Sequence, residues 1–285
     1  KLFHEREKRV RPTKDTKITT DWNGLMIAAF AKAARIDTEN ATRFREAAKN
    51  AIDWILDHHR TEEGWLAHEG VEKGEGESSK ESSKVSQNPS FSTDYAFIIY
   101  GLLETYKTTF NPELLNLAIE FQKQMVKRFW DEEEGGFYFS SHDGEKLLAR
   151  QKPIYDGAIP SGNSVAFHNL ERLYHITNDV HYLDLADKAT KLYGRSLHSN
   201  PTAFSFFLTA LEMRLNPFYL VTLVSQQGKE DGSDEDFEGS KATDLQQELH
   251  QDYFPNVFAL RITTEEEKQK IESINPSLKD RSEER

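Results

Sequence analysis

Three stretches of the sequence, Asn23–Ile27 (NGLMI), Thr93–Phe97 (TDYAF) and Asn163–Phe167 (NSVAF), recur at a spacing of 70 residues. Each stretch opens an apolar run with the period of an α-helix. A second, amphipathic run follows each of them, over residues 44–59, 114–129 and 182–197. Such a unit cannot bury its apolar face alone, so its repetition predicts stacked helical hairpins.

The two helices of each predicted hairpin differ in polarity. Residues 25–30 and 95–103 are apolar almost all round, whereas the second run of the first hairpin carries Arg43, Arg45 and Glu46 on one face. A helix that is apolar all round is buried, and an amphipathic one forms an outer wall. Alternating inner and outer helices are typical of an (α/α) toroid. About seven helices are predicted over residues 1–215, too few to close a complete ring of hairpins.

The hydrophobic pattern changes in the last quarter of the sequence, from helical periods to short apolar runs. Residues 218–224 and 256–262 read as buried strands, and residues 242–254 as a helix between them. Such a β-α-β unit has parallel strands. We therefore assign residues 216–285 to a small, partly disordered α/β tail. The stretch 70–92, rich in Gly, Ser, Lys and Glu, is expected to be a mobile insertion.

Composition excludes several classes of protein. The formal net charge of −12 argues against a nucleic-acid-binding protein. The chain has 0 Cys, which excludes disulfides and thiolate metal sites, and it shows no HExxH, P-loop or dinucleotide-binding motif. We predict no metal, no cofactor and no membrane span. The sequence begins inside a charged helical pattern without Met, so we expect part of a longer, cytoplasmic protein.

Carboxyl groups stand at the starts of the predicted inner helices, where a toroid opens its central funnel. Asp94 and Asp156 are the best pair among them. Two carboxyl groups about 5–10 Å apart, one protonated and one ionised, can cleave a glycosidic bond. The alternative for Asp94, and for Asp21, is capping of a helix N-terminus, because the first backbone N–H groups of a helix lack partners.

The loop 155–164 contains several glycine and proline residues, which have special backbone preferences. Gly157, Pro160 and Gly162 specify a fixed backbone that another group can approach closely. We predict a polyhydroxylated ligand near this loop, with stacking by aromatic rings, although rings at such places also serve as core. The predicted ligand contacts are Trp22, Asn23, Tyr95, Lys152, Tyr155, Ser161, Asn163 and His168.

Several motifs resemble those of the spermatogenesis-associated, thioredoxin-domain-containing family. They are Arg11-Pro12 with Asp15 and Lys17, Trp22–Met26, Asp94–Phe97, Gly135–Phe137, and Tyr155–Ser164 (YDGAIPSGNS). The resemblance implies an N-terminal thioredoxin-like domain, then a six-hairpin (α/α) domain similar to N-acylglucosamine 2-epimerases and unsaturated glucuronyl hydrolases, then a small α/β tail. The thioredoxin-like domain is absent from this chain, as is the family's Cys-containing terminal segment, and the family's usual Asp-Asp-Lys stands here as Asp15-Thr16-Lys17.

Two kinds of function remain open at this point. The first is an enzyme acting on a carbohydrate, either by hydrolysis with Asp94 and Asp156 or by epimerisation, for which His68 and His168 are the candidate bases. The second is a non-catalytic binding or scaffold module that accompanies the thioredoxin-like domain and missing helices of the same protein. Free, converging carboxyl groups with raised pKa values would favour the enzyme. Carboxylates engaged in caps or ion pairs would favour the scaffold.

Overall fold

The computed structural model describes residues 1–70, 90–224, 245, 248–249 and 254–279. Most of the predicted insertion at 70–92 and of the predicted helix at 242–254 therefore lies outside the described residues. The helical elements are α1 (Leu2–Glu7), α2 (Thr20–Ile36), α3 (Ala41–His58), α4 (Ser92–Thr109), α5 (Pro112–Phe129), α6 (Gly162–Thr177), α7 (Val180–Ser199), η1 (Pro201–Phe204), α8 (Ser205–Leu215), α10 (Glu265–Ile274) and η3 (Pro276–Leu278), and the strands are β1 (Tyr219–Val224) and β2 (Val257–Ile262).

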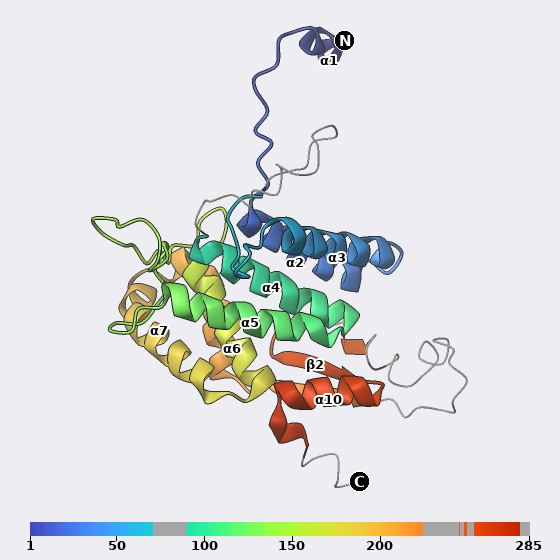
Figure 1. Cartoon of the computed structure of the whole chain (residues 1–285), viewed down its shortest axis with the longest axis vertical. Helices are drawn as coiled ribbons and strands as arrows, with labels where there is room; N and C mark the ends of the chain where they lie inside the picture. The colour runs from blue at the N-terminus through green and yellow to red at the C-terminus, as the bar shows by residue number, and fades with distance from the viewer. Residues whose placement is uncertain (71–89, 225–244, 246–247, 250–253, 280–285) are drawn as a thin grey trace.

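The helices form an inner and an outer layer. Helix α2 packs on α4, α4 on α6 and α6 on α8, while α3, α5 and α7 each pack on the helix that precedes them (Figure 1). The inner helix α4 buries 15 of its 18 residues, whereas the outer helix α3 buries 3 of 18. This confirms the prediction of a mainly α, partial (α/α) toroid of helical hairpins.

Two glycines allow α2 and α4 to pack backbone against backbone. A Cβ on Gly24 would lie 2.5 Å from the Phe97 carbonyl carbon, and one on Gly101 would lie 2.8 Å from the Gly24 carbonyl oxygen. Real Cβ atoms do not approach backbone so closely, so both positions require glycine. The contact fixes the start of α2 against the start of α4.

Each of the first two outer helices is followed by a tight turn at Gly64 or at Gly135-Gly136, all with positive φ. A left-handed backbone of this kind favours glycine. After the turn, the chain runs back toward the start of the inner helices, where Glu69 pairs with Thr19 in an isolated β-bridge. The return segment 65–69 thereby lies beside the first residues of α2.

The tail forms a two-stranded parallel sheet, as the sequence predicted, with Tyr219 opposite Val257. Phe258 of β2 stacks on Tyr106 of α4 at 5.6 Å between ring centroids, and the core of the sheet is continuous with that of the helices. Helix α10, which follows β2, was not predicted. The division at residue 215 stays a prediction.

None of the described helices is both long and apolar enough to cross a bilayer.

Candidate functional site

Three polar side chains meet where α2 and α4 begin, here called the entry cluster: Asp21, His68 and Asp94. One ligand-type atom of each lies within 4.8 Å of the other two. Nδ1 of His68 is 2.9 Å from Oδ1 of Asp94, a hydrogen-bond distance. The other oxygen of Asp94 accepts the backbone N–H of Phe91 at 2.7 Å. Asp94 therefore caps its helix and holds a histidine at the same time.

The positions of the three groups follow from the hairpin architecture. Asp21 and Asp94 lie in the first turns of α2 and α4, which the glycine contact brings together. His68 belongs to the return segment. Its own backbone carbonyl accepts the N–H of Thr20 at 2.9 Å. The hydroxyl of Thr20 also donates to the carbonyl of Ala67 at 2.5 Å. Two inner-helix starts and one return segment thus build one site.

Burial and the hydrogen bond between Asp94 and His68 shift the pKa values of both side chains. Burial raises the pKa of the Asp94 carboxyl to about 6, although the hydrogen bond to His68 opposes that rise. The hydrogen bond to Asp94 raises the pKa of the His68 imidazole. A carboxyl whose pKa is raised toward neutrality, hydrogen-bonded to an imidazole, is an arrangement that acid/base catalysis uses.

Exposure separates the roles of the two groups. The side chain of Asp94 is 0% exposed, and that of His68 is 20% exposed. A ligand arriving from solvent therefore reaches the imidazole and not the carboxyl of Asp94. Asp94 is a positioning residue for His68 in this arrangement, a role that the sequence did not predict for it.

Among the described residues, the entry cluster is also the group whose ligand atoms could surround one metal ion. Carboxylate oxygens and a neutral imidazole are suitable ligands for several divalent metals. The atoms of His68 and Asp94 are already hydrogen-bonded to each other, so an ion would have to replace that bond.

Asp156, the other predicted catalytic carboxylate, serves a different purpose. Its Oδ1 accepts the N–H of Ser161 at 2.8 Å, and its Oδ2 accepts those of Phe206 and Phe207 at 2.8 and 3.3 Å. The last two belong to the first turn of α8. The carboxylate therefore caps α8 and closes its own loop, and it is not among the groups of the entry cluster. The pairing of Asp94 with Asp156 as a dyad stays a prediction.

The polar side chains predicted around loop 155–164 are largely used within the chain. Asn163 accepts the N–H of Phe137 and donates to the carbonyls of Phe137 and Pro153, at 2.8–2.9 Å. Ser161 caps α6 by accepting the N–H of Ser164. Lys152 pairs with Asp131 at 2.7 Å and with Glu134 at 3.0 Å in the turn after α5. These contacts favour a structural interpretation of all three residues.

The predicted aromatic contacts divide into two groups. Tyr95 is fully buried, and its hydroxyl accepts the N–H of Leu66 at 3.0 Å, so its ring belongs to the core and offers no stacking face. Trp22 and Tyr155 are 66% and 69% exposed. Both exposed rings remain candidates to stack on a ligand.

The two remaining predicted contacts are already engaged or buried. Asn23 donates to the carbonyl of Thr19 at 2.8 Å within the start of α2. His168 is buried on α6 against Tyr100. Neither residue belongs to the entry cluster.

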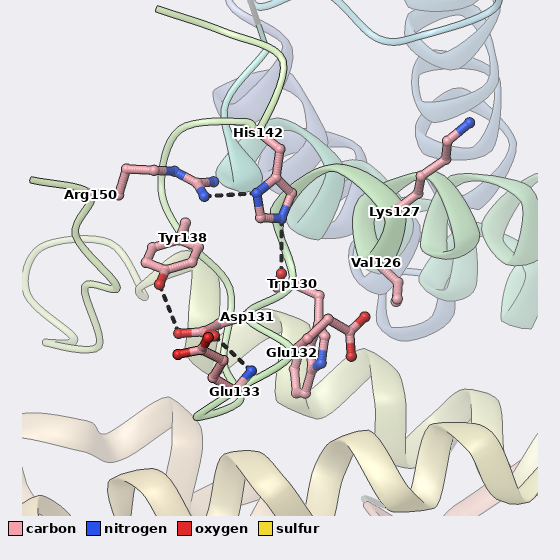
Figure 2. A pocket seen from close by; sticks show the side chains of 9 residues that line it. All are labelled: Val126, Lys127, Trp130, Asp131, Glu132, Glu133, Tyr138, His142 and Arg150. Atoms are coloured by element: carbon pink, nitrogen blue, oxygen red, sulfur yellow. Dashed lines mark hydrogen bonds between the residues drawn. The ribbon is translucent and has the colours of Figure 1, made fainter. Parts of the chain in front are cut away.

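A pocket of about 450 Å³ lies at the end of α5, and no residue of the entry cluster lines it (Figure 2). Its polar groups bind one another: Arg150 contacts Nδ1 of His142 at 2.8 Å, and Tyr138 donates to Asp131 at 2.8 Å. None of the residues predicted as catalytic or ligand-binding lines this pocket.

Sequence comparison supports the family resemblance. The chain is 28% identical over 257 residues to spermatogenesis-associated protein 20 of Homo sapiens, and the match covers 90% of this chain and 31% of the relative. It is 30% identical over 213 residues to the uncharacterized protein B0495.5 of Caenorhabditis elegans, covering 74% of this chain and 28% of that protein. The chain thus spans about a third of the length of these relatives. No family model matches the sequence.

Solved structures with a similar arrangement include two carbohydrate-active enzymes. Cellobiose 2-epimerase from Bacillus thermoamylovorans gives a TM-score of 0.47 at 18% identity, over 64% of this chain and 46% of that one. A family 105 glycoside hydrolase from C. acetobutylicum gives 0.46 at 15% identity, over 69% of this chain and 56% of that one.

His68 was predicted as a candidate base, but its pairing with Asp94 was not predicted. A signal was available, since His68 follows the Gly64 turn on the segment that returns to the inner-helix starts. The proximity of Asp21 to Asp94 depends on the glycine contact between α2 and α4. The repeat alone does not reveal that contact.

Proposed function

We propose that this chain contributes a carbohydrate-active site at the starts of α2 and α4, in which His68 transfers a proton. The observation that carries the proposal is the His68–Asp94 pair, with Nδ1 and Oδ1 2.9 Å apart and Asp21 beside them. With Nδ1 held by Asp94, Nε2 is the atom that faces a ligand in this mechanism. A carboxylate that orients an imidazole and stabilises its protonated form is a recurrent acid/base arrangement.

The geometry favours epimerisation or isomerisation over two-carboxylate hydrolysis. In such a reaction, the imidazole takes a proton from the carbon next to a carbonyl, and a proton returns to the opposite face or to the neighbouring atom. The nearby carboxyl of Asp21 is the candidate second acid/base group. Hydrolysis by the Asp94 and Asp156 pair would instead require both carboxyl groups to reach the substrate. Asp94 is fully enclosed, and Asp156 is occupied by three backbone N–H groups.

The proposal that the substrate is a carbohydrate rests on an exposed aromatic ring that is next in sequence to a residue of the entry cluster. Trp22 follows Asp21 directly and is 66% exposed, so its ring can stack on the apolar face of a sugar. Trp22→Ala should therefore weaken sugar binding several-fold and leave the free energy of unfolding within about 0.5 kcal/mol.

The test is a panel of reducing mono- and disaccharides incubated with the 285-residue chain in D₂O. Proton and carbon NMR would follow deuterium entering next to the carbonyl, together with any new epimer. Reducing-end assays on oligosaccharides would detect hydrolysis. Exchange that disappears in His68→Gln supports the proposal. New reducing ends that persist in His68→Gln would instead point to carboxyl-based hydrolysis.

The second candidate, a non-catalytic scaffold, is favoured by the loop around Asp156. Hydrogen bonds within the chain already occupy the Asp156 carboxylate and the side chains of Lys152, Ser161 and Asn163. Absence of sugar turnover and of sugar binding across the panel would support this function in place of the enzyme.

A further inference from the structure

A second group of polar side chains lies between the inner helices and shares no residue with the entry cluster. It is here called the inner basic cluster, and its members are Lys32 and Arg35 of α2, Tyr100, Glu104 and Lys107 of α4, and His168 and Arg172 of α6.

The helical period explains why these residues share one side of α4. Positions 100, 104 and 107 follow the i, i+4, i+7 rule for one face. Tyr95 lies on another face, where its ring packs against Phe121 and Phe129 of the outer helix α5. The face with the basic cluster is therefore turned away from α5 and toward α2 and α6. Glu104 lies ten residues after Asp94, about 15 Å along the helix axis.

Tyr100 stands at the centre of the cluster. The ring of His168 lies 5.5 Å from the Tyr100 ring, the ammonium of Lys32 lies 5.0 Å from it, and the guanidinium of Arg172 lies 5.8 Å from it. Lys32 also donates to the Tyr100 hydroxyl. Three inner helices thus direct polar groups to one aromatic ring.

Positive charge exceeds negative charge in this cluster. Glu104 uses one oxygen for Arg35 and the other for Arg172, both at 2.6 Å. In the part of the chain that the structure describes, neither Lys32 nor Lys107 forms an ion pair with a carboxylate. Burial, together with repulsion from Arg172, Arg35 and Lys32, lowers the pKa of Lys107 to about 7, although Glu104 opposes the shift.

Two buried polar atoms in the cluster lack partners. Nη1 of Arg172 and Nδ1 of His168 have no hydrogen-bond partner among the described residues, although the two residues are only 5% and 9% exposed. Burial, with the Arg172 charge, lowers the pKa of His168 well below its ordinary value, so its ring is neutral near pH 7. Buried guanidinium N–H groups are normally hydrogen-bonded, so Nη1 of Arg172 calls for an acceptor, and Nδ1 of the neutral His168 ring can donate to the same acceptor when it carries the ring proton.

We propose that the inner basic cluster binds the anionic group of a small molecule, a phosphate-type or carboxylate group, held by Arg172 and Lys107 with Lys32 at the entrance. Lys32 is exposed, so the cluster is reachable from solvent on that side. Charge-assisted hydrogen bonds from arginine and lysine are the usual means of holding such anions. The site is separate from the entry cluster, so either proposal can fail without the other.

The test measures anion binding to the 285-residue chain by isothermal titration calorimetry at constant ionic strength. Sulfate serves as the probe for a phosphate-type group, because it does not titrate near pH 7, and acetate serves as the probe for a carboxylate. We expect saturable one-site binding of at least one of them. Tighter binding of sulfate assigns a phosphate-type ligand, and tighter binding of acetate a carboxylate.

Matched variants separate this site from general salt effects. Lys107→Gln and Lys32→Gln should each weaken binding at least about tenfold. Lys123→Gln removes the same charge from the exposed outer surface of α5 and should leave binding unchanged. Both cluster variants keep the Glu104 ion pairs with Arg35 and Arg172, so the fold should be retained, which circular dichroism would verify.

Proton uptake provides a readout that a surface salt effect would not give. An anion beside Lys107 stabilises its charged form, so binding at pH 7.5 should take up protons, seen as a dependence of the binding heat on the buffer's ionisation enthalpy. Lys107→Gln should abolish the uptake. Equal, non-saturable heats in the wild-type chain, Lys107→Gln and Lys123→Gln would overturn the proposal.

Discussion

Asp94 and Asp156 look alike in the sequence, since each lies at the entry to an inner helix, yet the structure uses them differently. Asp94 gives one oxygen to a backbone N–H and keeps the other for His68. Asp156 gives both oxygens to backbone N–H groups. The difference comes from what packs beside each residue: a return segment bearing a histidine in one case, and the start of α8 in the other. Of these two carboxylates, the functional candidate is the one that faces a titratable group.

A substitution of His68 gives the strongest test of the difference between Asp94 and Asp156. His68→Gln removes the group that Asp94 holds, so turnover of any substrate found should fall at least about a hundredfold. The free energy of unfolding should change by less than about 1 kcal/mol, because the side chain is partly exposed. His198→Gln, at an exposed position near the end of α7, is the matched control and should keep full activity. Unchanged turnover in His68→Gln would remove the imidazole from the mechanism.

Gly24→Ala tests whether the entry cluster depends on the backbone contact of α2 with α4. The new Cβ would lie 2.5 Å from backbone, so the helices must move apart. We expect a loss of about 2–3 kcal/mol in urea unfolding, and lower activity as Asp21 and His68 shift relative to Asp94. In the control Gly194→Ala, nothing lies within 4 Å of the new Cβ in α7, so stability should rise by about 0.5–1 kcal/mol. Equal stability changes in the two variants would show that the close contact is unimportant.

Asp156→Ala should act on folding alone. It leaves three backbone N–H groups without their carboxylate, and we expect the free energy of unfolding to fall by about 1–2 kcal/mol. Asp156→Asn keeps an oxygen acceptor and should restore about half of the loss. Thermal and urea unfolding measure both effects. An Asp156→Asn chain that folds normally but loses turnover would give this residue a catalytic role after all.

The smallest effect concerns pH. Folding raises the pKa of Asp94 to about 6 and raises that of His68, so both groups bind protons more tightly in the folded chain. Their contribution to stability is present at low pH and is lost as pH rises through about 6 and beyond. Asn at position 94 cannot titrate. The free energy of unfolding of the wild-type chain relative to Asp94→Asn should therefore fall by about 1 kcal/mol between about pH 5.3 and 7.5. A difference that rises over this range would mean that the carboxylate is stabilised by folding.

The layering of the helices was predictable from the sequence alone, because burial follows polarity. The run 95–103 is apolar on every side and became an inner helix, and residues 44–59 are amphipathic and became an outer one. The two strands of the tail were also predictable, since short apolar runs bounded by turn residues have few alternatives. Helix α10 was not predicted, because its sequence is dominated by charged residues and it buries only Ile271 and Ile274.

The contacts between polar groups depend on how the helices pack, which the sequence pattern does not show. Asp94 and His68 are 26 residues apart, and Glu104 and Arg172 are 68 apart. Their contacts depend on how closely α2, α4 and α6 approach one another. The distance between α2 and α4 is set by Gly24 and Gly101, whose missing side chains leave no periodic signal in the sequence. Local pattern fixes which face of each helix is buried, whereas the partner found on that face is decided by packing between helices far apart in the chain.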